Sequence, residues 1–176
     1  MKIFLRAVLI LALAALGVWL WTILFPSPEK MIRGQLMKLA RDVSFSQTEN
    51  DFVKLARAQI VAGFFSTNVE VNLNVPGRES QTFAGRDEIT QLAMAARQTV
   101  GSLDVKFPDV NVAVAPDKNS ATADVTVEAT VSGQRDAIVQ EMKFTFEKIE
   151  GQWLITKVET ARTLSILNFE SPENFS

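Results

Sequence analysis

The sequence contains no cysteine, no histidine and no tyrosine among its 176 residues. The absence of cysteine excludes disulfides, thiolate metal ligands and thiol nucleophiles. The absence of histidine excludes imidazole ligands, Ser-His-Asp triads and the usual general base near neutral pH. Proton transfer would fall to aspartate, glutamate and lysine alone. We therefore expect no catalytic residue and no cofactor in this chain.

Clustered positive charge is also missing. The net charge is −2, and the first 26 residues carry Lys2 and Arg6 with no acid, so the rest of the chain has a net charge of −4. The remaining lysines and arginines are scattered among acidic and apolar positions. Binding to a phosphate backbone requires a basic cluster. The sequence therefore predicts no nucleic-acid partner.

A long uncharged run lies close to the N-terminus. Residues 7–25 are apolar apart from one threonine. As a helix they would be about 28 Å long, close to the thickness of a bilayer core, with Trp19 and Trp21 near one end. A cleaved signal peptide is the alternative, but its apolar run is usually shorter and followed by small residues. The run predicts contact with the membrane through a single span.

The charges around this run predict its orientation. Lys2 and Arg6 precede the span, so the positive-inside rule leaves the N-terminus in the cytoplasm. We expect a single-pass protein of the inner (cytoplasmic) membrane, with a periplasmic or extracellular domain. The expected divisions are an anchor over residues 1–26, a domain over 27–164 and a loose tail over 165–176.

The exported part begins with helical patterns. Ser27 is a suitable N-cap and Pro28 suits the first helical position. Apolar residues at three-to-four spacing predict helices over residues 28–44 and 47–63, the second opened by a capping-box pattern from Ser46 to Glu49. A third helix is expected between Gly85 and Gly101.

Alternating patterns predict strands in the rest of the domain. A short hairpin is expected over residues 69–75 and 80–84, with Pro76-Gly77 at its turn. Alternation then continues to the end of the domain. The four further strands expected there cover residues 103–115, 120–132, 138–150 and 152–164. We expect an antiparallel sheet with the helices on one face and water or a partner on the other.

The order of these elements resembles the nuclear transport factor 2-like superfamily, also called SnoaL-like, over about residues 30–164. The segments Gly85 to Ile89 and Gly151 to Ile155 carry most of the resemblance. It implies an α+β fold in which three helices pack on a strongly bent antiparallel sheet. The resulting cone is open to a ligand in some members and filled in others, and many members dimerise through the sheet. The enzymatic branches use Asp, His and Tyr inside the cone, and this chain has only the Asp.

The acidic residues on the expected strands do not point to a catalytic interior. Most share the polar side of the alternation and so face away from the helices. They are Glu70, Asp109, Asp124, Glu128, Glu141, Glu147 and Glu159. No Asp-x-Asp-x-Asp loop occurs, and Asp87-Glu88 suits the start of a helix. We therefore predict no metal site.

Two sets of residues are candidates for binding. Nine aromatic residues could line a lipophilic pocket or simply pack the core: Phe45, Phe52, Phe64, Phe65, Phe83, Phe107, Phe144, Phe146 and Trp153. We select six of them as possible pocket lining, namely Phe52, Phe64, Phe83, Phe144, Phe146 and Trp153, with the direction of Trp153 left open. A possible association face consists of Thr126, Glu128, Glu141, Lys143 and Thr145, although these residues could equally be plain solvated surface.

Three functions are consistent with these patterns. The first is a non-enzymatic, membrane-anchored extracytoplasmic domain that binds an envelope protein, a second copy of itself or an apolar small molecule. The second is a structural subunit of a membrane complex, as in type IV secretion machines, and the third is a small-molecule dehydratase, cyclase or isomerase. Paired acids in an empty cavity would favour the enzyme. An apolar cavity would favour ligand binding, and a filled cone would favour a protein partner.

Overall fold

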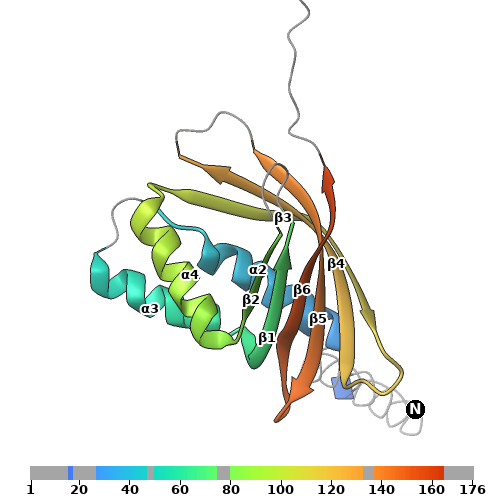
Figure 1. The fold of residues 1–176 in the computed structure, drawn as a ribbon. Coiled ribbons are helices and arrows are strands. Elements are labelled where there is room, and N and C mark those ends of the chain that lie inside the picture. The colour runs from blue at the N-terminus through green and yellow to red at the C-terminus, as the bar shows by residue number, and fades with distance from the viewer. Residues whose placement is uncertain (1–15, 18–26, 47–49, 75–79, 133–136, 165–176) are drawn as a thin grey trace, which may run out of the picture.

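Three helices cover one face of a six-stranded sheet (Figure 1). The structure is a computed structural model, and it describes residues 16–17, 27–46, 50–74, 80–132 and 137–164. The helices are α2 (Pro28–Val43), α3 (Asp51–Ala62) and α4 (Arg86–Thr99). The strands are β1 (Phe65–Leu73), β2 (Gln81–Ala84), β3 (Leu103–Val114), β4 (Ser120–Val131), β5 (Ile138–Ile149) and β6 (Gln152–Leu164). The α+β class and the order of the elements are as the sequence predicts.

The helix boundaries follow from local capping. The hydroxyl of Ser27 accepts a hydrogen bond from the backbone N–H of Lys30 at 3.5 Å, and α2 begins at Pro28 as predicted. The start of α3 differs from the prediction, because Asn50 is its N-cap and accepts from the N–H of Val53 at 2.9 Å. Asparagine is as strong an N-cap as serine. The helix therefore begins at Asp51, four residues later than the sequence pattern suggests.

The sheet is mixed, which corrects the prediction of an antiparallel sheet. Its order is β2-β1-β6-β5-β4-β3, and β1 pairs with β6 in parallel, with Val71 opposite Val158. All other neighbours are antiparallel. Alternation along a strand reports which side chains are buried, but it does not report which distant strand lies alongside. The hairpin β1-β2 therefore extends the sheet at β6 in a direction that the pattern could not reveal.

The sheet bends strongly around α2 (Figure 1). Its pairing register shifts within β3, β5 and β6, and such bulges bend a strand and increase its twist. The shift in β3 lies between Lys106 and Asp109 and includes Pro108, which cannot donate a ladder hydrogen bond. Because β3 is an edge strand, this proline costs no pairing on its open side. The hairpin between β5 and β6 closes through Glu150 and Gly151, both with positive φ.

The core fills the space between α2 and the concave face of the sheet. Ile32 and Leu36 of α2 and Phe146 and Ile155 of the sheet are all 0% exposed. Trp153, whose direction the sequence left open, points inward and is 5% exposed. The interior is therefore closely filled beside the first half of α2.

Several predictions fall on residues that the structure does not describe. The expected membrane span over 7–25 lies outside the described residues apart from 16 and 17, as do the turn at Pro76-Gly77 and the tail over 165–176. Within the described part of the chain, no helix has the length and apolar character needed to cross a bilayer.

Candidate functional site

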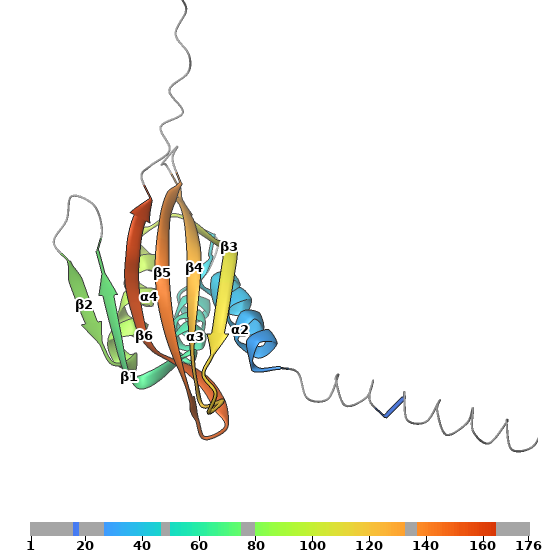
Figure 2. The same cartoon turned by 90° about the vertical axis from the view of Figure 1, so that its right-hand side faces the viewer.

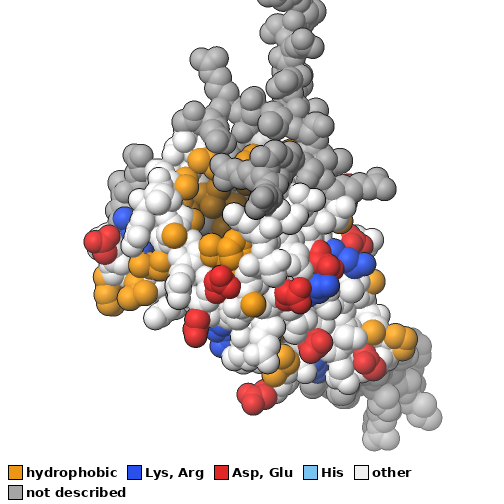
Figure 3. Space-filling view, viewed as in Figure 1, with side chains coloured by type: hydrophobic (Ala, Val, Ile, Leu, Met, Phe, Trp, Pro, Cys, Tyr) orange, Lys and Arg blue, Asp and Glu red, His pale blue; other side chains and the backbone are white. Residues whose placement is uncertain are grey.

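A small apolar pocket lies where the end of α2 meets α3, α4 and the start of β3. We call it the upper pocket. Its volume is about 230 Å³, and its lining residues are Val43, Phe45, Val61, Phe65, Ile89, Leu92, Ala93, Ala96, Arg97 and Leu103. Arg97 is the charged member of this set among the described residues. On the face seen in Figure 3, hydrophobic side chains gather in a hollow between α4 and β3.

The local sequence explains why a pocket remains here. In α4, Ile89, Ala93 and Arg97 follow one another at intervals of four and so share a face of the helix. The alanines on this side occupy little volume, which leaves space that larger side chains would fill. The opposite wall is held by backbone hydrogen bonds between Phe45 and Leu103, at 2.8 and 3.0 Å.

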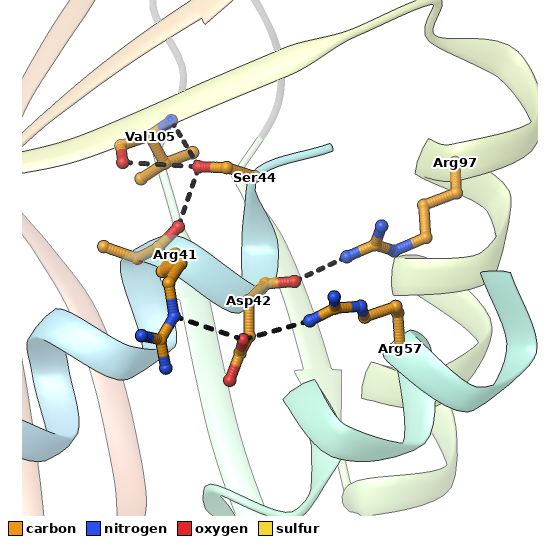
Figure 4. A network of polar contacts seen from close by, with 7 residues as sticks. Arg41, Asp42, Ser44, Arg57, Arg97 and Val105 are labelled. Carbon is orange, nitrogen blue, oxygen red and sulfur yellow. Dashed lines mark hydrogen bonds and ion pairs between the residues drawn. The ribbon is translucent and has the colours of Figure 1, made fainter. Parts of the chain in front are cut away.

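Arg97 is the buried charge of the pocket. It is 4% exposed, and its Nη2 donates a hydrogen bond of 2.5 Å to the backbone carbonyl of Asp42 (Figure 4). Its guanidinium also lies over the ring of Phe45, 4.8 Å from the ring centroid. Asp42 is in the last turn of α2, where carbonyl groups lack partners within the helix and a cation is favoured. Arg97 therefore fastens α4 to the end of α2.

Further polar contacts hold the same helix end (Figure 4). The Oδ1 atom of Asp42 lies 3.4 Å from Nη1 of Arg57 and 3.8 Å from Nε of Arg41. The hydroxyl of Ser44 donates to the carbonyl of Ala40 at 2.8 Å and accepts from the N–H of Val105 at 2.9 Å. These contacts join the end of α2 to α3 and β3 beside the pocket.

The arrangement can hold an apolar group, and it places a permanent positive charge beside that group. A guanidinium does not lose its proton in a protein, so Arg97 is not a general base. The strand acids lie where the alternation predicts: Glu70, Asp109, Asp124 and Glu147 are exposed, and Glu128, Glu141 and Glu159 are partly buried. Across the described ranges, no three acidic side chains are grouped closely enough to hold a metal ion.

The six aromatic residues selected from the sequence do not line one common pocket, although Phe64 and Trp153 both line a depression between α2 and the turn of β5 and β6. Phe144, Phe146 and Trp153 belong to the core, and Phe64 and Phe83 are half-buried beside it. Phe52 is 82% exposed on α3, so its side chain does not share an interior space with the others. Phe45 and Phe65, from the wider aromatic set, do line the upper pocket.

Sequence reasoning did not find Arg97, Leu92, Ala93 and Ala96 as site residues. One signal was present, because Arg97 falls four residues after Ala93 on an otherwise apolar helix stripe. A charge in that position must be exposed at the helix end or satisfied inside. Only the tertiary structure, which brings Arg97 to the carbonyl of Asp42, distinguishes these two outcomes.

The proposed association face lies on the outer side of β4 and β5. Thr126 is paired with Glu141, and Thr145 with Thr122, in the cross-strand register. Lys143 lies between Asp124 of β4 and Glu159 of β6, so charges of alternating sign cross the sheet. On β6, a hydrogen bond of 2.7 Å from Lys157 to Glu159 raises the pKa of Lys157. The use of this face for association remains a prediction.

Comparison with known proteins identifies the fold. A scytalone dehydratase-like protein from Novosphingobium aromaticivorans is similar, with 15% identity over 81% of this chain and 87% of that one and a TM-score of 0.57. An NTF2-like protein of unknown function from Pseudomonas putida has 11% identity over 78% and 87% of the two chains and a TM-score of 0.58. The yeast UBP3-associated protein BRE5 has 14% identity over 80% and 99% and a TM-score of 0.59. No protein-family model and no curated protein matches the sequence.

These likenesses establish a nuclear transport factor 2-like fold for the domain, as the sequence resemblance predicts. At such low identity they establish the fold alone. The fold includes both binding proteins and dehydratase or isomerase enzymes, so the function must be argued from the site.

Replacing Arg97 tests the role of the buried guanidinium. We expect Arg97→Met to lower the free energy of unfolding by about 1–3 kcal/mol, because it leaves a buried carbonyl without its partner. Arg57→Met serves as the control, since the Arg57 side chain is 46% exposed and its ion pair should contribute less than about 1 kcal/mol. Denaturant unfolding of the full chain in detergent measures both. Equal losses in the two variants would contradict this assignment.

Proposed function

We propose that this chain is a membrane-anchored binding domain that holds a small apolar ligand in the upper pocket, without catalysing a reaction. The observation that carries the proposal is the nature of the pocket wall: it is apolar on every side apart from Arg97. Apolar pockets with one or two polar groups are typical of small-molecule binding sites. The outward position of the strand acids supports binding over proton-transfer chemistry.

The size of the pocket limits the ligand. A volume of about 230 Å³ is below the usual range for drug-sized ligands, which begins near 300 Å³. An apolar cavity of roughly 150 Å³ accepts a benzene molecule. The pocket therefore suits one or two fused rings or a short alkyl chain. The positive charge of Arg97 favours a ligand that also carries an anionic group.

Filling the pocket tests ligand binding. We use 1-naphthoate as the probe and the full chain in lipid nanodiscs, with saturation-transfer NMR as the measurement and empty nanodiscs as the blank. Ala96→Phe places a ring in the pocket, and we expect it to weaken binding by at least about tenfold, or about 1.4 kcal/mol. Ala95→Phe is the matched control, because Ala95 is the exposed neighbour on the same helix. Equal binding by both variants, or none by the unmodified chain, would refute the proposal.

The proposal includes anchoring by residues 7–25, with the domain on the far side of the cytoplasmic membrane. Its support is the length of the uncharged run and the position of Lys2 and Arg6 before it. In cells that express the full chain, we expect the protein to stay in the membrane pellet after an alkaline wash.

A single thiol tests the orientation of the anchor. Because the chain has no cysteine, Ile138→Cys gives a single thiol at an exposed position. A membrane-impermeant maleimide should label it in cells with a permeable outer envelope. A washed-out chain, or a thiol that is labelled only after lysis, would contradict the anchor or its orientation.

Association through the outer sheet face is a second candidate. Asp124, Lys143 and Glu159 form a row of alternating charge, and such a row can complement a second copy turned by a two-fold axis.

Reversing the central charge of this row tests the association. We expect Lys143→Glu to weaken a dimer of the full chain in detergent by about tenfold or more, since three acids would then lie side by side. Sedimentation at several protein concentrations measures the change, and Lys54→Glu on α3 controls for charge reversal alone. A chain that is monomeric before the substitution would exclude this candidate.

A further inference from the structure

A second apolar depression lies further toward the N-terminal end of α2 than the upper pocket. We call it the basal groove. It has a volume of about 700 Å³ and runs between residues 30–38 of α2, the end of α3 and the turn between β5 and β6. Met31, Ile60, Phe64 and Leu154 contribute its apolar wall, and Gln35 closes its floor by donating a hydrogen bond of 2.7 Å to the carbonyl of Trp153.

The apolar side chains at the rim of this groove are exposed. Met31 is 46% exposed and Ile60 is 48% exposed, although both are large hydrophobic residues. They come from different helices and meet at the same opening, so they form one patch and not isolated surface positions. A rimmed apolar patch of this kind marks a contact with a partner or a membrane.

The charges of the groove have one sign. Lys30 and Lys38 line it, and no carboxylate does so among the residues that the structure describes. Glu29 lies in the same helical turn as Lys30, but its carboxylate is bound at the start of α2. Hydrogen bonds with its own backbone N–H and with Ser27 lower the pKa of Glu29, and the positive charge of Lys118 lowers it further. Apolar side chains flanked by lysines suit the boundary between phosphate headgroups and acyl chains.

The position of the groove in the chain brings it close to the bilayer, and this step rests on the proposed anchor. The expected span ends at residue 25 and α2 begins at Pro28, so three steps of the chain separate them, at most about 10 Å. The headgroup layer is about 5–8 Å thick on each side of a bilayer. The turn between β5 and β6 lies at the same end of the domain as the start of α2 in both views (Figures 1 and 2). The groove is therefore on the side of the domain that a short linker holds against the membrane.

We propose that the basal groove is a membrane-contact site that takes the surface of a phospholipid bilayer. Met31 and Ile60 enter the boundary between headgroups and acyl chains, while Lys30 and Lys38 contact lipid phosphates. The contact orients the domain with the upper pocket away from the membrane. A ligand then reaches that pocket from the aqueous side.

Single thiols in the cysteine-free chain test this contact. Met31→Cys and Ile60→Cys place a fluorescent label in the groove, in the full chain reconstituted into vesicles of phosphatidylcholine and phosphatidylglycerol. Each has a matched control on its own helix: Met37→Cys for α2 and Leu55→Cys for α3, since Met37 and Leu55 are both 43% exposed. Nitroxide-labelled lipid and aqueous iodide serve as quenchers. We expect lipid quenching to exceed iodide quenching at positions 31 and 60, and the reverse at 37 and 55.

The outcomes separate this inference from the proposed function. If the chain resists an alkaline wash but all four labels are quenched alike, the membrane contact is wrong and the anchor stands. If the wash releases the chain, both are wrong. If energy transfer between labelled copies occurs at positions 31 and 60 without lipid quenching, a second copy fills the groove and the membrane contact is again wrong.

Two variants of opposite charge at Gly34 provide a second measurement. Outside its chain neighbours and the adjoining backbone of α2, a Cβ atom on Gly34 meets no atom within 4 Å, so a side chain fits there without displacing the fold. We expect Gly34→Glu to weaken the contact between the domain and anionic vesicles by at least about fivefold relative to Gly34→Lys. Lipid quenching at position 60 measures this contact. The two variants should unfold at similar temperatures. Equal quenching in both would overturn the role of lipid phosphates.

Discussion

The hydrogen bond from Arg97 to the carbonyl of Asp42 is the contact on which the site depends. It brings a buried cation to the C-terminal end of α2, where the helix dipole and an unpartnered carbonyl both favour positive charge. Because Arg97 is in α4, the same bond joins α4 to the C-terminal end of α2. The upper pocket lies beside this junction, and its wall comes from α4, the ends of α2 and α3, and the first residues of β1 and β3. The residue that makes the junction is therefore also the charge of the pocket.

The two ends of α2 have different chemistry, which gives the domain a direction. At its C-terminal end, Arg97, Ser44 and the bridge between Phe45 and Leu103 satisfy the backbone and enclose an apolar pocket. At its N-terminal end, lysines flank an open apolar groove. In the proposed arrangement the groove faces lipid and the pocket faces water. The anchor would then be part of the function, since it decides which end of the domain a ligand can reach.

Much of the fold could be predicted from the sequence because it depends on local patterns. The alternation along β4 and β5 places Ala123, Val125, Phe144 and Phe146 inside, and all four are buried. Ser27 and Pro28 identify the start of α2 by capping alone. The errors arise where a non-local contact decides. The parallel pairing of Val71 with Val158 joins strands from opposite ends of the domain, and no periodicity reports it. Phe52 and Phe146 are the same residue type, yet one is 82% exposed and the other 0%.

The sequence by itself determined the class of the domain, the order of its elements and the outward position of the strand acids. Each of these depends on residue type and spacing along one stretch of chain. Tertiary structure alone decided that Arg97 is buried against Asp42, that the pocket lies between α4 and the end of α2, and that Met31 and Ile60 meet at one groove. These depend on how separate helices approach one another. That approach is set by the summed packing of many side chains, which no single stretch of sequence contains.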